Sequence, residues 1–233
     1  MILETKPTLQ NIYNMSLLLI THLDGGIVEI QLNRPKANAI NHEMVLQLAE
    51  TYKTLAIDDT VKGVYLIGQS PFFSAGLDVI ELFGYDENQI KTFWFDFANM
   101  VKTLASFPKP FVSAISGHSP AGGCVLALCA DYRIMQEGKF KIGLNEVAVG
   151  VVVPNAIFEL YSFALGSQQA YQALMSAKMF TVEEAKNAGL VHLTCKEEAL
   201  KQNALAVVSQ LCAFETKTWQ TSKQTMRARL IDT

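Results

Sequence analysis

The feature that most constrains the fold is an alternation of short apolar segments with longer helical ones. Residues 61–67, 111–115 and 132–135 have the length and composition of buried strands. Between them, residues 87–105 and 121–129 have the composition of helices. This alternation favours a parallel sheet with helices on its faces. The loops after the strands of such a sheet supply the functional groups, so we expect the decisive residues there.

Two strands and a helix are predicted at the start of the chain. Residues 17–23 and 27–32 are apolar and partly alternating, and the Asp-Gly-Gly sequence at 24–26 is typical of a hairpin turn. Apolar residues then recur at helical spacing over residues 45–55. The chain is therefore predicted to open with an antiparallel hairpin that is followed by a helix.

Beyond Pro154 the sequence is mostly helical. One late helix has a single apolar stripe, formed by Leu200, Ala204, Val207, Val208 and Leu211. We find no internal repeat and no low-complexity linker before this region. It is therefore predicted to cover the sheet, or to contact another subunit, rather than to form an independent domain.

Charge and hydrophobicity exclude several classes of protein. Half of the 233 residues are hydrophobic, which predicts a sizeable buried core. The net charge of -3 and the dispersed Lys and Arg residues argue against nucleic acid as a partner. No apolar stretch approaches the roughly 20 residues that cross a bilayer, so no membrane partner is expected. The start of the chain lacks the features of a secretory signal or transit peptide, which predicts a cytoplasmic protein.

The cysteines show neither a CxxC pair nor a regular framework. Free cysteines are readily buried, and two of these lie in an apolar helical segment. We therefore predict reduced core thiols at Cys124, Cys129, Cys195 and Cys212.

Two glycine-containing loops follow predicted strands. Residues 72–78 follow the strand that ends near Ile67, and residues 116–123 lead from the strand 111–115 into an apolar helix. Small residues let the backbone approach a ligand closely, and the first amides of a helix lack internal partners, so both loops can attract negative charge. The alternatives are an ordinary strand-to-helix turn in the first loop and glycines for helix packing in the second.

A single acid, Glu146, lies among apolar and small residues at 142–150. If its side chain faces an apolar pocket, burial raises its pKa toward neutrality, which suits a general base. The alternative is an exposed loop glutamate. The residues by themselves leave both interpretations open.

Four motifs, taken together, resemble those of the enoyl-CoA hydratase/isomerase, or crotonase, superfamily. They are an early segment at 34–40, Ser-Ala-Gly-Leu-Asp at 74–78, Pro-Ala-Gly-Gly-Cys at 120–124 with Cys-Ala-Asp-Tyr-Arg-Ile at 129–134, and Gly-Leu-Asn-Glu at 143–146. The likeness runs in order from about Leu17 to Leu230. Within the superfamily the sequence is most similar to the mitochondrial-type Δ3,Δ2-enoyl-CoA isomerases.

The resemblance implies an α/β crotonase (ClpP/crotonase-like) fold, with repeated ββα units and a helical C-terminal region. It divides the chain into an N-terminal extension (1–16), a crotonase core (17–195) and a C-terminal helical region (196–233) that is short for the family. It also implies association into a homotrimer or hexamer.

The resemblance further implies an acyl-CoA substrate and a role in fatty-acid metabolism. The amides of Leu77 and Gly122 would bind the thioester oxygen, and Glu146 would move a proton from C2 to C4. No metal or redox cofactor is expected, because coenzyme A is part of the substrate and one base suffices. The residues expected to border the substrate and its coenzyme A are Ser74, Ala75, Gly76, Leu77, Asp78 and Gly122.

Val125 favours isomerisation over hydration. Hydratases that resemble this chain carry a second glutamate near the start of the same helix, and valine cannot activate water. The alternatives are an enoyl-CoA hydratase, another crotonase-type acyl-CoA enzyme, or a protein that binds acyl-CoA without turnover. His118 and Ser119 are adjacent and unsuited to a nucleophilic dyad, so they are expected to satisfy loop hydrogen bonds.

Two groups of side chains have a structural interpretation beside a functional one. The aromatic residues at 93–97 are expected to pack in the core rather than beside the acyl chain. Basic residues near the end of the chain are expected either to contact coenzyme A phosphates or to be solvated. These basic residues are Lys217, Lys223, Arg227 and Arg229.

Overall fold

The computed structural model describes residues 16–231, so the predicted N-terminal extension lies outside it except for Ser16. The chain opens with the expected hairpin of β1 (Leu18–Leu23) and β2 (Ile27–Leu32), which pair antiparallel. Gly25 and Gly26 both adopt φ of 76° in the short 3-10 turn η1 (Asp24–Gly26). Glycine reaches this left-handed region without a steric penalty, which explains the turn sequence.

The main sheet has the order β1-β2-β3-β4-β6-β9, and every pairing from β2 onward is parallel. Its further strands are β3 (Gly63–Ile67), β4 (Phe111–Ile115), β6 (Tyr132–Gln136) and β9 (Leu193–Cys195). All residues of β3 and β4 are buried, as expected for strands that are covered on both faces. The parallel sheet predicted from the alternation is therefore confirmed.

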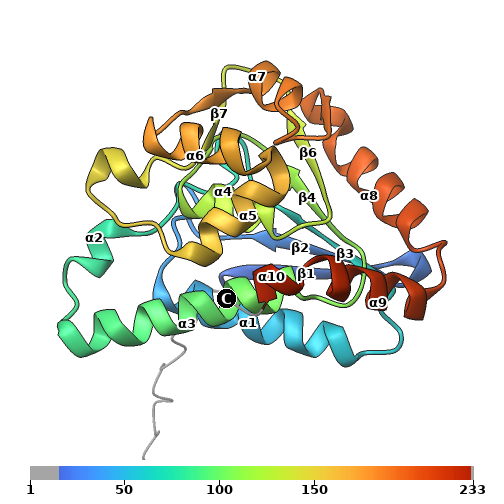
Figure 1. Cartoon of the computed structure of the whole chain (residues 1–233). Helices are drawn as coiled ribbons and strands as arrows, with labels where there is room; N and C mark the ends of the chain where they lie inside the picture. Colours follow the sequence, from blue (N-terminus) through green and yellow to red (C-terminus); the bar gives the residue numbers. More distant parts are fainter. Residues whose placement is uncertain (1–15, 232–233) are drawn as a thin grey trace, which may run out of the picture.

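One face of the sheet is covered by α1 (His42–Ile57), α3 (Glu87–Ala105), α4 (Gly122–Leu128) and α5 (Asn155–Leu165), as Figure 1 shows. The other face is covered by α8 (Leu200–Leu211), which lies on the right in Figure 1. The predicted stripe faces the sheet through Leu200, Ala204 and Val208, while Val207 and Leu211 are only partly buried. The sheet thus lies between α1, α3, α4 and α5 on one face and α8 on the other.

A second sheet, which the sequence did not predict, consists of β5 (Ser119–Pro120), β7 (Lys141–Gly143) and β8 (Phe180–Thr181). β5 pairs parallel with β7, and β7 pairs antiparallel with β8. Strands of two or three residues are too short to show a two-residue period. β5 lies just before α4 and β7 lies just before Glu146, so their pairing holds these two segments side by side.

The remaining elements are helical. They are α2 (Val79–Leu82), η2 (Glu146–Val149), α6 (Ser167–Met175), α7 (Val182–Asn187), η3 (Glu197–Ala199), α9 (Thr216–Met226) and α10 (Ala228–Ile231). The last pair divides at Arg227, and α10 contacts α3 and α5. Within residues 16–231, no helix is both long and apolar enough to cross a membrane.

Candidate active site

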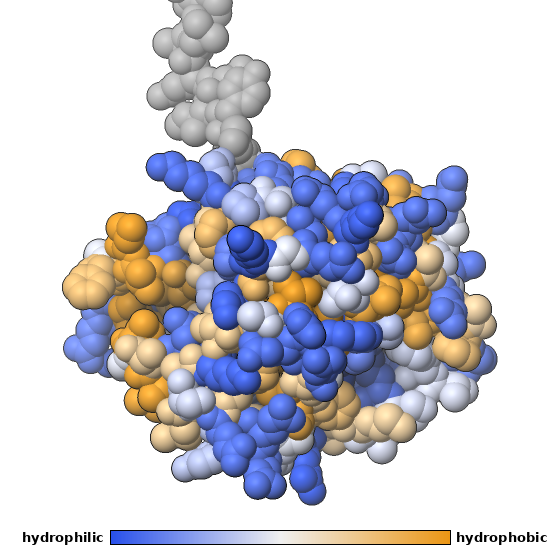
Figure 2. All heavy atoms as spheres, turned by 90° about the horizontal axis from the view of Figure 1, so that it is seen from above, coloured by the Kyte–Doolittle hydropathy of each residue, from blue (hydrophilic) through white to orange (hydrophobic). Residues whose placement is uncertain are grey.

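A cavity of about 650 Å³ opens between α3, α4 and the segment from Asn145 to Ile157. This volume lies within the range of roughly 300–1,000 Å³ that small-molecule sites occupy. Its lining is mainly apolar and includes Val79, the first residue of α2 (Val79–Leu82). Ile80 within α2 and Phe83 at its C-cap are 87% and 94% exposed. Figure 2 shows hydrophobic side chains gathered on the left, the side on which α2 lies in Figure 1. The cavity therefore suits a ligand with a long apolar part.

The first glycine-containing loop presents the Leu77 amide. The Ile40 amide donates to the Gly76 carbonyl at 2.8 Å, and the Asp78 amide donates to the Ile40 carbonyl at 2.9 Å. Leu77 lies between Gly76 and Asp78, and its amide has no hydrogen-bond acceptor among the described residues. An unpaired amide beside an apolar cavity is a ready donor for a ligand oxygen.

The second loop places Gly122 next to the first. Gly76 has φ of 86°, and a Cβ on it would lie 3.3 Å from the Gly122 nitrogen and 3.1 Å from the Pro120 oxygen. Gly76 therefore has to be glycine both for its conformation and for this close approach. Gly122 is the first residue of α4, so its N–H has no acceptor within the helix.

Ala121, immediately before Gly122, has a backbone conformation that L residues rarely adopt. Its φ and ψ are 46° and -121°. Its amide donates to the Gly143 carbonyl at 2.9 Å, and its carbonyl accepts from the Val125 amide at 3.0 Å. Such strained residues persist only where the surrounding contacts hold them, and they are concentrated at functional sites. The turn into α4 is thus held from both sides.

Glu146 begins η2, three residues after the end of the strand β7. It lines the cavity, and its Oε2 is buried without a hydrogen-bond partner among the described residues. Burial raises the pKa of this carboxyl above its ordinary value. The expectation of a partly buried acid beside an apolar pocket matches this environment, whereas an exposed loop glutamate does not.

The structure brings part of the predicted site together. The cavity is lined by Ala75, Leu77, Gly122, Val125 and Glu146. Ser74, Gly76 and Asp78 are not among the described residues that line it. The Ser74 hydroxyl donates to the Asn38 carbonyl at 2.7 Å, and Asp78 forms an ion pair with Arg34 at 2.7 Å. These residues support the loop, and their role in binding coenzyme A stays a prediction.

Part of the aromatic cluster lies in the cavity wall. Trp94, Phe95 and Phe97 line the cavity, while Phe93 is fully buried and stacks on Phe97. The expected core packing is confirmed for Phe93 and Phe97, which are buried in the main core, and Trp94 packs against that core. It is wrong for Phe95, which is 68% exposed. Core packing and cavity lining coincide at Trp94 and Phe97, because α3 borders a cavity as well as other helices. The sequence also missed the wall formed by 151–157, which has an apolar composition but no distinctive motif.

Two other expectations have different outcomes. His118 accepts a hydrogen bond from the Lys141 amide at its Nδ1 at 3.2 Å, as expected. The same expectation is wrong for Ser119, whose hydroxyl is buried without a hydrogen-bond partner among the described residues. Lys223 and Arg227, by contrast, are buried and contact Asp131 at 2.8 and 3.3 Å. They are therefore neither solvated nor available to phosphates, and the prediction for them is wrong.

All four cysteines are free, two of them buried and two partly buried. No group of acidic, His or Cys side chains within residues 16–231 has the arrangement of a metal site.

Comparisons with known proteins identify the family of the chain. A family model described as Enoyl-CoA hydratase/isomerase matches residues 22–233. The chain is 32% identical to "Enoyl-CoA delta isomerase 1, mitochondrial" of Mus musculus, over 94% of this chain and 76% of that protein. It is 28% identical to a "Probable enoyl-CoA hydratase" of Rhizobium meliloti (strain 1021), over 91% and 82%.

A similar fold has been solved. The crystal structure of human mitochondrial delta3-delta2-enoyl-CoA isomerase matches with a TM-score of 0.90 at 30% identity, covering 93% of this chain and 85% of that one. The names of the mouse and human relatives place those proteins in mitochondria, while the cytoplasmic localisation expected for this chain stays a prediction.

Proposed function

The chain belongs to the enoyl-CoA hydratase/isomerase family, and from this premise we propose that it is a Δ3,Δ2-enoyl-CoA isomerase. One observation carries the proposal. Among the described residues that line the cavity, Glu146 is the one carboxylate, and Val125 lies in the same wall. The position at which the family resemblance implies a second glutamate in hydratases is therefore occupied by an apolar side chain.

The proposed reaction needs one base and an oxyanion site. Glu146 removes a proton from C2 of a 3-enoyl-CoA, and the electron pair of that C–H bond delocalises over the thioester carbonyl and the C3–C4 double bond. The amides of Leu77 and Gly122 stabilise the negative charge on the thioester oxygen. In comparable oxyanion holes one such donor lowers the activation barrier by about 3 kcal/mol. Glu146 then returns the proton to C4, which leaves the double bond between C2 and C3.

The environment of Glu146 suits both halves of this cycle. Because its pKa is raised, the Glu146 carboxylate is a stronger base toward the C2 proton than an ordinary glutamate, and the resulting carboxylic acid can still return the proton to C4. The apolar wall around it excludes water that would otherwise compete for the intermediate. Valine at 125 has no polar atom with which to orient a water molecule for addition.

The test is a comparison of two reactions in one preparation. Purified protein is mixed with 3-hexenoyl-CoA, and the absorbance of the conjugated product is followed; separately, loss of conjugation is followed with a 2-enoyl-CoA. We expect rapid isomerisation and little hydration. Faster hydration than isomerisation would contradict the proposal in favour of a hydratase. Two flat traces together with measurable binding would favour a non-catalytic acyl-CoA-binding protein.

A pair of variants at Val125 sharpens this test. Val125→Glu restores a second acid and is expected to introduce slight hydratase activity. Val125→Gln is the matched control, because it has a similar size and no carboxylate. If both variants hydrate equally, or neither differs from the parent, the argument from Val125 is wrong.

A further inference from the structure

We propose that Lys223 and Arg227 of the C-terminal helix pair are positioning residues for the oxyanion site, because they hold the far end of the helix that begins with Gly122. The inference rests on the proposed function in one respect, namely that the Gly122 amide contacts the thioester oxygen. It assigns a catalytic consequence to a pair of buried cations that do not line the cavity.

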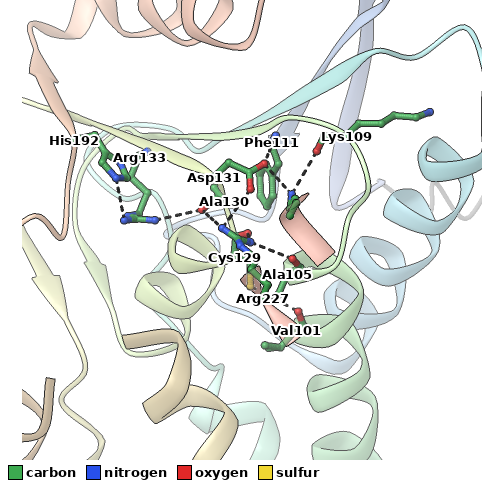
Figure 3. A network of polar contacts seen from close by, with 11 residues as sticks. Val101, Ala105, Lys109, Phe111, Cys129, Ala130, Asp131, Arg133, His192 and Arg227 are labelled. Atoms are coloured by element: carbon green, nitrogen blue, oxygen red, sulfur yellow. Dashed lines mark hydrogen bonds and ion pairs between the residues drawn. The ribbon is translucent and has the colours of Figure 1, made fainter. Parts of the chain in front are cut away.

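Arg227 binds the backbone at the end of α4 (Figure 3). Its Nη1 donates to the Cys129 carbonyl at 2.7 Å and to the Ala105 carbonyl at 3.0 Å, and its Nη2 donates to the Ala130 carbonyl at 3.0 Å. The last carbonyls of a helix have no intrahelical partner, so the guanidinium supplies donors that α4 lacks. One planar group therefore joins the end of α4 to the end of α3.

Lys223 and Asp131 complete the attachment. The Lys223 ammonium donates to Asp131 Oδ2 at 2.8 Å, and the same oxygen accepts from the Phe111 amide at 2.9 Å. The other carboxylate oxygen lies 3.3 Å from Arg227 Nη2. Asp131 lies three residues after the last residue of α4, and Phe111 begins β4, so these contacts fix the segment at the end of α4 against the sheet.

The positive charges of Lys223 and Arg227 lie at the C-terminal end of α4, where positive charge is stabilising. The C-terminus of a helix carries partial negative charge, and cations there are stabilising. Arg133 adds a further donor, from Nη1 to the Ala130 carbonyl at 3.2 Å. Removing one buried cation would leave carbonyls or the Asp131 carboxylate without their partners, which is unfavourable in a buried site.

Few side chains of the helix that carries these cations are buried. Lys223 is the one buried residue of α9, Trp219 is partly buried and stacks on Phe214, and Arg227, which is also buried, is the C-cap of the helix. The docking of α9 therefore depends largely on the two cations. Loss of either cation is expected to loosen α9 and the end of α4 together.

A shift at the end of α4 is transmitted to Gly122. Every residue of α4 is buried, and a helix of this length spans only about 10 Å, so it moves as one body. A misplacement of about 1 Å in a reacting group can lower a rate about a hundredfold. The strained turn at Ala121 makes the direction of the Gly122 amide dependent on contacts at both ends of the helix.

The test measures the oxyanion contact directly. The infrared frequency of the thioester carbonyl of a bound 2-enoyl-CoA is compared in the parent protein, Arg227→Met, Arg227→Lys and the control Gln224→Met, an exposed position of α9. We expect a lowered carbonyl frequency in the parent and in the control. Arg227→Met should lose most of this lowering and about tenfold or more in kcat, with KM changed less than about threefold. Arg227→Lys should be intermediate, since one ammonium cannot reproduce the planar fork.

A folded Arg227→Met protein with the parent's carbonyl frequency and kcat would overturn the proposal. If that variant does not fold, Lys223→Met, which retains the three Arg227 contacts with backbone carbonyls, takes its place under the same criterion. A parent protein that lowers the carbonyl frequency but does not isomerise refutes the isomerase function and leaves this test valid. A parent that does not lower the frequency overturns the oxyanion assignment and this inference with it.

Discussion

The burial of Glu146 makes its protonation matter for catalysis. Replacing it with glutamine removes the base but keeps the shape of the side chain. We expect Glu146→Gln to lower kcat for isomerisation by about a hundredfold or more, the usual size of general-base catalysis. The exposed Glu197→Gln is the control, and near-normal turnover by a folded Glu146→Gln protein would refute the role of the base.

The same burial predicts a pH dependence. Because the pKa of Glu146 is raised, kcat/KM should fall as the pH drops through a value above the ordinary 4.5 of a glutamate. The folded state binds this proton more tightly than the unfolded state, so ionised Glu146 lowers stability above its pKa and the loss disappears in acid. Glu146→Gln should therefore be more stable than the parent near pH 7, with a difference that shrinks toward acid. A difference that is constant with pH, measured by urea unfolding, would contradict this.

Individual residues differ in how far the sequence reveals them. Glu146 was predictable because a lone acid in an apolar segment is unusual, whatever its partners. Lys223 and Arg227 were not, because charged residues on a late helix are normally solvated and the partner, Asp131, lies 92 residues before Lys223. Trp94 and Phe97 were expected to pack in the core, and the sequence did not show that they also line a cavity, because a helical pattern does not distinguish a cavity wall from a core.

At the scale of elements, α8 contributes stability without contributing to the cavity. Leu200 is buried against the sheet face opposite α3 and α4. We expect Leu200→Ala to lower the free energy of unfolding by about 2–5 kcal/mol and to leave kcat and KM unchanged. Leu205→Ala on the same helix is the control, because that side chain is 36% exposed. Equal losses in the two variants, or a loss of kcat in Leu200→Ala, would show that α8 does not act as described.

Most elements were predictable where local chemistry and period agree. The bounds of α3 match the expected 87–105, because Asp86 and Gln89 form a capping box before an amphipathic segment. The hairpin turn was fixed by its glycines. The small sheet of β5, β7 and β8 was missed, since its pairings join segments too short to carry a pattern and depend on how the loops pack.

At the scale of the whole molecule, buried cations make stability depend on pH on the alkaline side. Burial, assisted by the neighbouring Arg227 guanidinium, lowers the pKa of Lys223 to about 8. The unfolded state then binds more protons than the folded state above this pH, so the free energy of unfolding should rise between about pH 8 and pH 10. Lys223→Met should flatten this slope, as measured by urea unfolding across that range. A falling slope in the parent would contradict the assignment.

The association implied by the family resemblance, a homotrimer or hexamer, stays a prediction. Exposed apolar side chains are present on the surface, among them Phe83 after α2 and Val152 in the cavity wall, which are 94% and 89% exposed. Patches of this kind commonly mark interaction surfaces. Sedimentation equilibrium is expected to give three or six times the chain mass of 25.7 kDa, and a monomer at micromolar concentration would contradict the prediction.

The Arg227 contacts also have a consequence for kinetics. They join positions separated by 98 residues at Cys129 and by 122 residues at Ala105, so forming them closes long loops at an entropic cost. We expect these contacts to be absent from the folding transition state, and the loss of such contacts acts mainly on the rate of unfolding. Their loss should therefore accelerate unfolding far more than it slows folding. The lifetime of the native protein, rather than the speed with which it is reached, depends on this guanidinium.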